Sequence, residues 1–130
     1  MPAASVDESL LKGFVDYYQE DIQRFFPGFS LRGIPQPRCV FTLRNLMPVG
    51  LFVVEKLDAE ALRIHLDYVI REYRDLRNAR YLYSTQAGLF KEQGFKEFQV
   101  KPGSPKFAAY VKHLGFAPAA GEAGLYTKRF

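Results

Sequence analysis

The N-terminal part of the chain carries apolar residues at the spacing of an amphipathic helix. Ser5 and Glu8 have the form of a capping box, which satisfies the free backbone N–H groups at a helix start. Beyond them, apolar side chains recur every three or four residues until Pro27. They are Leu10, Leu11, Phe14, Val15, Tyr18, Ile22, Phe25 and Phe26. The pattern predicts one helix of roughly five turns that ends at Pro27, followed by a proline-containing loop over residues 31–38.

Three runs rich in β-forming residues come next, at residues 40–44, 51–56 and 62–69. Residues 47–50 and 57–60 have turn character and are short, which favours an antiparallel meander. Because side chains alternate between the two faces of a strand, we expect the apolar residues of the third run on one face and its polar residues on the other. The apolar set is Leu62, Ile64, Leu66 and Tyr68, and the polar set is Arg63, His65 and Asp67.

The C-terminal half of the chain alternates helices and strands. Residues 78–92 predict a helix that ends at the next glycine, and residues 95–100 predict a strand. This strand returns after a crossover helix, so it should run parallel to the strand before that helix. Ser104 has the place of an N-cap for a helix over residues 106–114, and residues 125–130 form a last strand.

The composition is that of an ordinary globular protein. The 130 residues are 48% hydrophobic and 25% charged, and the order of the elements predicts a single α/β domain over residues 1–130. The N-terminus lacks the segments of a signal peptide, and no run is long enough to span a membrane, so we expect a cytoplasmic protein. The formal net charge of +4 favours an anionic ligand but is small for a dedicated nucleic-acid binder.

Neither thiol nor metal chemistry is indicated by the sequence. Cys39 is the single cysteine and stands beside a strand-like run, where we expect a buried structural thiol. His65 and His113 are far apart in the sequence and lack acidic or cysteine companions at metal-ligand spacing. We therefore expect no metal cofactor.

Three segments of the chain match motifs of a known superfamily. The first is Pro48-Val49-Gly50 before a strand, and the second is residues 67–74, a strand that leads into a loop opened by an arginine. The third is residues 110–116, where a helix that carries a tyrosine ends in Gly-Phe. Together they resemble the GNAT superfamily of acyl-CoA-dependent N-acyltransferases. The resemblance implies a mixed, mostly antiparallel sheet flanked by helices, although the few residues before the first helix leave little room for the family's first strand.

The second segment would bind the coenzyme. The family's loop pattern is Arg/Gln-x-x-Gly-x-Gly/Ala; on it Arg74 is the opening residue, Arg77 replaces the first glycine and Ala79 fills the last position. Backbone N–H groups from Leu76 to Ala79 would hold the diphosphate of acetyl-CoA or another acyl-CoA at the start of a helix. Glycine lets a phosphate approach the backbone closely, so the side chain of Arg77 either crowds the phosphate or turns outward and adds its charge.

Further contacts with the coenzyme are implied around this loop. The backbone of residues 69–71 would pair with the pantetheine arm, and the arginines would surround the phosphates. A solvated, salt-bridged surface with Glu72 and Asp75 is the other interpretation of these arginines. Ser104 either contacts the coenzyme or serves only as an N-cap. The implied cofactor-binding residues are Val69, Ile70, Arg71, Arg74, Asp75, Leu76, Arg77, Asn78, Ala79, Arg80 and Ser104.

The implied reaction is acetyl transfer from acetyl-CoA to a primary amine by direct attack on the thioester. The backbone N–H of Val69 or Ile70 would polarise the carbonyl, and Tyr110 would protonate the leaving thiolate, unless its ring only packs in the core. A base must take the proton of the amine, and the candidates are Glu55, His65, Asp67 and Glu72. The acceptor, a small-molecule amine or a protein, is not defined; an apolar or acidic one is weakly favoured by Phe25, Phe26, Arg32 and Arg38.

Two other functions stay open. A degenerate domain of this superfamily would bind CoA or a protein partner without catalysis, which Arg77 in place of glycine favours. Nucleic-acid binding would use the arginines together with Tyr68, Tyr73 and Tyr81 as stacking partners, but the modest net charge disfavours it. The sequence does not define the oligomeric state, and a homodimer stays open.

Overall fold

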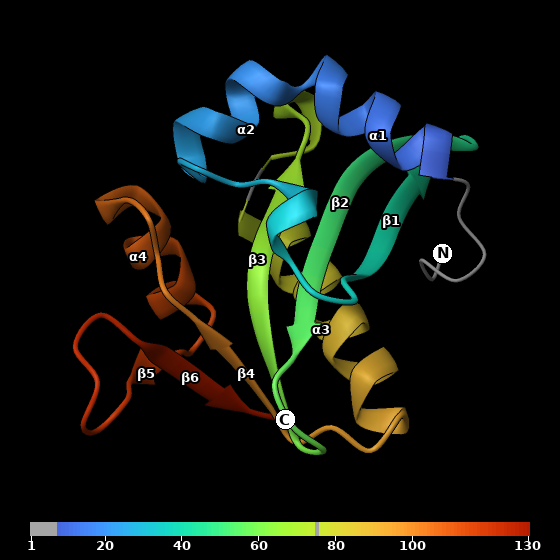
Figure 1. Ribbon diagram of the computed structural model, residues 1–130. Coiled ribbons are helices and arrows are strands. Elements are labelled where there is room, and N and C mark those ends of the chain that lie inside the picture. Colours follow the sequence, from blue (N-terminus) through green and yellow to red (C-terminus); the bar gives the residue numbers. More distant parts are fainter. Residues whose placement is uncertain (1–7, 75) are drawn as a thin grey trace.

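The computed structural model describes residues 8–74 and 76–130 and shows one central sheet with helices on both faces (Figure 1). The elements in chain order are α1 (Glu8–Tyr17), α2 (Gln19–Phe25), η2 (Leu31–Gly33), β1 (Arg38–Arg44), β2 (Met47–Lys56), β3 (Ala61–Val69), η3 (Arg71–Tyr73), α3 (Leu76–Glu92), β4 (Glu97–Val100), α4 (Pro105–His113), β5 (Ala117–Pro118) and β6 (Tyr126–Arg129). The predicted α/β fold is confirmed.

The sheet is mixed and mostly antiparallel. Its strand order is β1-β2-β3-β4-β6-β5, and β3 with β4 form the parallel pair among antiparallel neighbours. Both the predicted meander and the predicted parallel return after the crossover helix are therefore confirmed. Buried residues of α1 and α2 pack on one face of the sheet, and those of α3 and α4 pack on the other.

Strands β3 and β4 separate halfway along β3. They pair from Ala61 with Glu97 to Ile64 with Val100, and β3 then continues to Val69 without β4 beside it. Figure 1 shows β4 leaning away from β3 towards α4. The backbone edge of β3 is therefore unpaired beyond this point, which leaves hydrogen-bonding groups for a ligand.

The prediction that the apolar residues of β3 share one face is wrong. Val54 pairs with Ile64 but its neighbour Val53 pairs with Leu66, so His65 is an extra residue in β3. Such a β-bulge shifts the alternation of side chains by one position. Leu62 and Ile64 consequently pack with α3 and α4, whereas Leu66 and Tyr68 pack with α1 and α2.

The first hairpin turns at Asn45 and Leu46, not at residues 47–50 as predicted. Their φ values are 50° and 65°, which is the backbone of a two-residue turn that matches the twist of antiparallel strands. Pro48 pairs with Leu43 inside the ladder of β1 and β2. The prediction gave weight to proline and glycine and overlooked that asparagine tolerates this conformation.

The predicted N-terminal helix is divided into α1 and α2 at Tyr18. Backbone hydrogen bonds from Tyr18 to Phe14 (3.1 Å) and from Ile22 to Tyr18 (2.9 Å) continue across the division, so the two helices follow one another closely. The predicted caps further along are confirmed. Gly94 ends α3 with a φ of 95°, and Ser104 Oγ accepts a hydrogen bond from the Phe107 N–H (3.2 Å) at the start of α4.

The described residues start at Glu8, and α1 is the first element among them, so the family's first strand has no counterpart there. The predicted buried thiol is confirmed, since Cys39 is 1% exposed and burial raises its pKa to about 11. In the part of the chain that the structure covers, no helix has the length and apolar character needed to cross a membrane.

Candidate functional site

A cleft of about 540 Å³ lies where β3 has left β4. Its walls come from α2, the end of β3, the turn after β3, and one side of α4. The lining residues are Phe25, Phe26, Asp67, Tyr68, Val69, Tyr73, Arg74, Lys106, Phe107, Ala109, Tyr110 and His113. The volume is in the range that buries a small organic ligand. The site thus follows from the sheet topology, because the separation of two parallel strands opens it.

The backbone of Val69 faces this cleft. The Ile70 N–H donates to the Val49 carbonyl at 2.8 Å, so Ile70 belongs to the ladder with β2. Backbone groups of successive strand residues point to opposite sides, which directs those of Val69 away from β2. Of the two predicted donors to a thioester carbonyl, the Ile70 N–H is already engaged within the sheet, and Val69 is the one that faces the cleft.

Asp67 and Tyr110 meet across the cleft. The Tyr110 hydroxyl donates a hydrogen bond to Asp67 Oδ2 at 3.2 Å. Burial raises the pKa of Asp67 to about 6, although the hydrogen bond from Tyr110 opposes this rise. Burial and the neighbouring carboxylate both raise the pKa of Tyr110 as well. Above pH 6 the pair therefore consists of an ionised Asp67 and a protonated Tyr110, beside the free edge of β3.

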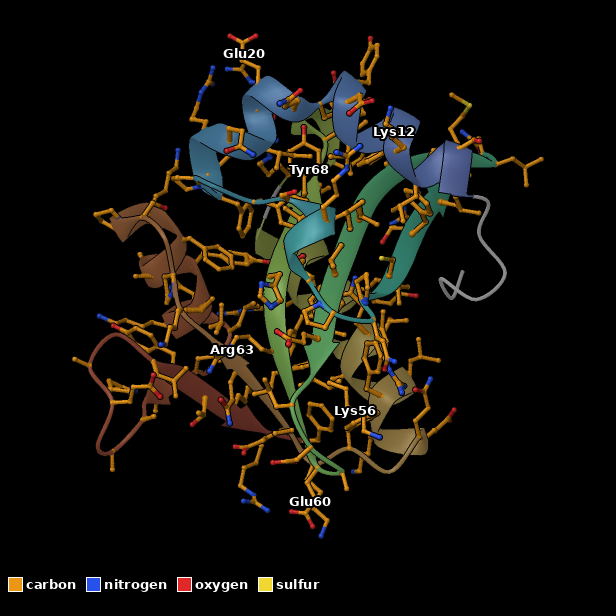
Figure 2. All side chains as sticks on the ribbon, in the orientation of Figure 1. Lys12, Glu20, Lys56, Glu60, Arg63 and Tyr68 are labelled. Carbon is orange, nitrogen blue, oxygen red and sulfur yellow. The ribbon has the colours of Figure 1, made fainter. Side chains whose placement is uncertain are left out.

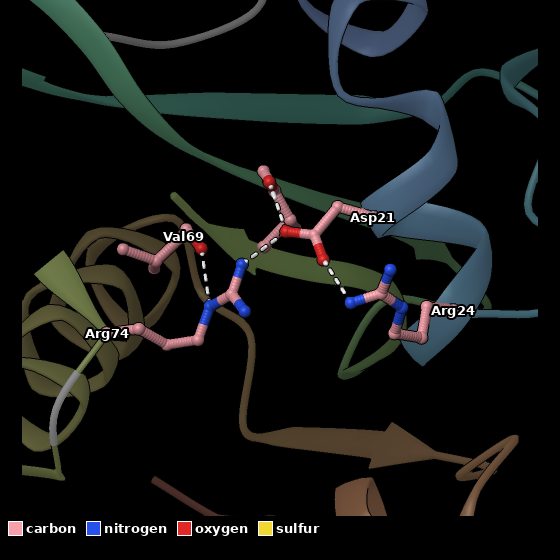
Figure 3. Close-up of polar contacts among 5 residues, drawn as sticks. Asp21, Arg24, Val69 and Arg74 are labelled. Atoms are coloured by element: carbon pink, nitrogen blue, oxygen red, sulfur yellow. Dashed lines mark hydrogen bonds and ion pairs between the residues drawn. The ribbon is translucent and has the colours of Figure 1, made fainter. Parts of the chain in front are cut away.

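Arg74 forms an ion pair with Asp21, a residue that the sequence motifs do not include. Its guanidinium donates to Asp21 Oδ2 at 2.6 Å and to the Val69 carbonyl at 2.9 Å (Figure 3). The Tyr68 hydroxyl donates to the same Asp21 oxygen at 2.8 Å, and Arg24 lies 3.8 Å from the other one. Burial would raise the pKa of Asp21, but the hydrogen bonds from Arg74 and Tyr68 outweigh it and lower that pKa.

The salt-bridged interpretation of the arginines named Glu72 and Asp75 as neighbours. Asp75 lies outside the described residues, and Arg74 does not pair with Glu72. The partner of Arg74 is Asp21, 53 residues away in the sequence, and it ties α2 to the turn after β3. Tyr68 is only 3% exposed, so its ring is not available to stack on a nucleobase. The nucleic-acid interpretation loses one of its predicted stacking residues.

The other predicted cofactor-binding residues that the structure describes do not line the cleft; they are Ile70, Arg71, Arg80 and Ser104. Arg71 and Arg80 are exposed, and Arg80 lines a second cavity of about 420 Å³ with His113. Asp75 and the side chains of Leu76, Arg77, Asn78 and Ala79 lie outside the described residues, so the effect of Arg77 on a phosphate stays a prediction. Ser104 has the geometry of an N-cap.

Several cleft residues were missed by the sequence analysis. Lys106 is one of them, and its ammonium group lies 5.3 Å from the centre of the Phe25 ring. The guanidinium of Arg74, which was predicted, lies 5.1 Å from the centre of the same ring. Phe107 stacks on Tyr110, with ring centres 5.6 Å apart. Arg38, expected near an acceptor, instead hydrogen-bonds Gln93 beyond the end of α3 at 3.0 Å. No sequence motif marks Lys106 or Phe107, because only the fold brings α2 and α4 together.

The remaining base candidates lie apart from the cleft lining. His65 Nε2 and Glu55 Oε1 are 2.9 Å apart on the face of the sheet that carries α1 and α2. Glu72 is exposed in η3. Within residues 8–74 and 76–130, no group of three or more His, Cys, Asp or Glu residues is arranged to hold a metal ion.

Comparisons with known proteins identify the fold. No protein-family model matches the sequence, and no curated protein matches it. A GNAT-family acetyltransferase from Staphylococcus aureus superposes with a TM-score of 0.71 at 15% identity, over 95% of each chain. Tetrahymena GCN5 superposes with a TM-score of 0.69 at 11% identity, over 91% of this chain and 87% of that one.

A third solved structure is described with a ligand. It is a GNAT-family acetyltransferase from Elizabethkingia anophelis with acetyl-CoA bound, which has a TM-score of 0.61 at 15% identity, over 84% of this chain and 88% of that one. At these identities the likeness is one of architecture. The three matches and the separated parallel strands show that this chain has the fold of the GNAT superfamily.

Proposed function

We propose that this protein is an acyl-CoA-dependent N-acyltransferase that transfers an acetyl group from acetyl-CoA to a primary amine. The observation that carries the proposal is the cleft between β3 and α4, with the Val69 backbone on one wall and the Tyr110 hydroxyl on the other. The acetyl-CoA described in the structural neighbour from Elizabethkingia anophelis supports the choice of co-substrate.

The walls of the cleft suit a pantetheine arm. The arm contains amide groups, which can add to a free strand edge as another strand would, and β3 offers such an edge at Val69. Lys106 and Arg74 supply positive charge in the lining of the cleft. Arg74 stands two residues before the start of α3 at Leu76, where backbone N–H groups favour a diphosphate. Aromatic rings, among them Phe107, cover the rest of the arm.

The chemistry would then proceed by direct attack. The Val69 N–H polarises the thioester carbonyl, the amine nitrogen forms a bond to its carbon, and the carbon–sulfur bond breaks. The nitrogen loses one proton to a base, and the departing sulfur gains one from Tyr110. Tyr110 then recovers a proton from the solvent, and its hydrogen bond to Asp67 holds the hydroxyl in place. No covalent enzyme intermediate is needed.

One observation favours a second candidate, a domain that binds a partner without catalysis. Arg74 already satisfies the Val69 carbonyl and pairs with Asp21, so a coenzyme would have to displace it to use that carbonyl. A protein in which Arg74 never leaves Asp21 would keep the GNAT fold but not the activity.

Calorimetry and a thiol-release assay separate the candidates. We expect acetyl-CoA to bind in a saturable manner and free thiol to appear when a suitable amine is added. Binding without thiol release across a broad panel of amines would favour the non-catalytic domain. Absence of binding heat and of a thermal shift would contradict the use of acyl-CoA.

A further inference from the structure

A polar row crosses the face of the sheet that carries α1 and α2. Strand pairing places Glu55 opposite Arg63, Arg63 opposite Gln99, and Gln99 opposite Thr127. The neighbours of these residues along the strands pack on the other face, so the row lies on the α1 and α2 side. Figure 1 shows both helices crossing the opposite end of this face, and Figure 2 shows Arg63 beside β4 on the part that they leave open.

Arg63 is a half-buried charge that makes no ion pair within 4 Å among the described residues, although Glu122 lies close enough to feel its charge. Its guanidinium forms no ion pair there, and its Nε atom is buried without a hydrogen bond. The carboxylates nearby are engaged elsewhere: Glu55 by His65 at 2.9 Å and Glu122 by Lys101 at 2.6 Å. A guanidinium in this situation suits a carboxylate of a ligand, which it can bind with two hydrogen bonds.

His65 stands next to this arginine, at the point where β3 and β4 separate. It is the extra residue of the bulge, directly after the last paired residue Ile64. When the ring is neutral and its Nε2–H donates to the Glu55 carboxylate, the other ring nitrogen, Nδ1, carries a lone pair. That nitrogen can take a proton from an amine, and Glu55 orients the ring.

We propose that this open face is the acceptor site, and that the acceptor is a primary amine that carries a carboxylate, as an amino acid does. The proposal rests on the acyl-CoA-dependent function above. Arg63 binds the carboxylate, and His65 Nδ1 takes one proton from the amine, directly or through a water molecule, as the nitrogen bonds to the acyl carbon. The carbon–sulfur bond breaks at the same centre, and the sulfur takes its proton from Tyr110.

Matched acceptors test the role of Arg63. Transfer rates are compared within three pairs of acceptors: glycine with glycinamide, alanine with alaninamide, and glutamate with its α-amide. In each pair, the amide lacks the negative charge of the α-carboxylate. We expect kcat/KM at least tenfold higher for the carboxylates. Arg63→Gln should remove the preference by raising their KM about tenfold to a hundredfold, while the control Arg44→Gln, an exposed arginine on β1, should keep it.

The outcomes separate this inference from the function on which it rests. Equal rates for acids and amides, retention of the preference in Arg63→Gln, or no transfer to any of these amines would overturn the inference while acetyl-CoA binding upholds the coenzyme site. If acetyl-CoA does not bind to the unaltered protein, the proposed function and the inference fail together. Acetyl-CoA affinity, measured by calorimetry for each variant, shows that the fold has been kept.

A second set of variants tests His65 and its positioning residue Glu55. His65→Gln should lower kcat about a hundredfold or more without changing the acceptor KM, because the base is lost and the carboxylate contact is not. Glu55→Gln should lower kcat less, and Glu55→Asp should recover part of the loss. An unchanged kcat in His65→Gln would refute the assignment of the base.

Discussion

Replacing Asp67 with asparagine should stabilise the protein at neutral pH. Burial raises the pKa of Asp67 from 3.8 to about 6, so the folded state binds the proton more tightly than the unfolded chain does. Below pH 3.8 Asp67 is protonated in both the folded and the unfolded state, so its burial does not make the stability depend on pH. As the pH rises towards 6 the unfolded chain loses its proton first, so stability falls, and above pH 6 the full cost of about 3 kcal/mol is present.

Asparagine removes the charge but keeps an oxygen that can accept from Tyr110. We expect Asp67→Asn to exceed the unaltered protein by about 1–3 kcal/mol in free energy of unfolding at pH 7.5, and by almost nothing at pH 4. The chain contains no tryptophan, so urea unfolding is best followed by circular dichroism at both pH values. The control is Asp16→Asn on α1, whose side chain is 60% exposed and whose pairing with Lys12 should contribute little.

The reasoning would be refuted by an Asp67→Asn variant that is less stable at pH 7.5, or by an advantage that does not change with pH. Either result would mean that the carboxylate of Asp67 is better solvated than its position in the cleft indicates. The same variant bears on mechanism, because an amide carries no negative charge to raise the pKa of Tyr110.

Three further changes have expected outcomes. Asp21→Asn should lower the free energy of unfolding by about 1–2 kcal/mol at pH 7. The loss should shrink as the pH falls through the lowered pKa of Asp21, because Asp21 stabilises the fold only when it is ionised. A loss that is the same at pH 7 and pH 3 in urea unfolding would speak against the contacts with Arg74. Gly94→Ala should lower the free energy of unfolding by about 1 kcal/mol, because φ is 95° at this position. Gly88→Ala, in open space inside α3, should raise the free energy of unfolding by about 0.5–1 kcal/mol. Equal shifts of the melting temperature in the two variants would contradict this. Tyr110→Phe should lower kcat about a hundredfold in the thiol-release assay and leave acetyl-CoA affinity unchanged; full activity would exclude Tyr110 as the acid.

The order of elements could be predicted from the sequence because it depends on local patterns. Alternation, helical spacing and caps such as Ser104 indicate which segments are helices and strands, and short links require antiparallel neighbours. The bulge at His65 could not be predicted, because an extra residue leaves the alternation of apolar and polar letters intact. It is visible only in the pairing with β2, and it moves Asp67 to the side of α4.

The site was predictable where it depends on one segment and not where it depends on contacts between distant ones. Val69 and Tyr110 were found because each belongs to a recognisable motif, and both line the cleft. The contact between Asp21 and Arg74 joins residues that no periodicity relates. The same holds for Arg63, whose significance comes from the neighbours that β2 and β4 supply and from the absence of an ion pair among the described residues.

A crystal structure of the protein with acetyl-CoA would test the central claim most directly. The account predicts the pantetheine arm along the free edge of β3 at Val69, the thioester within reach of Tyr110, and the diphosphate at the start of α3, with Arg74 released from the Val69 carbonyl. Two results would contradict it: coenzyme bound elsewhere on the molecule, or crystals grown at saturating acetyl-CoA in which the cleft stays empty and Arg74 keeps its contact with the Val69 carbonyl.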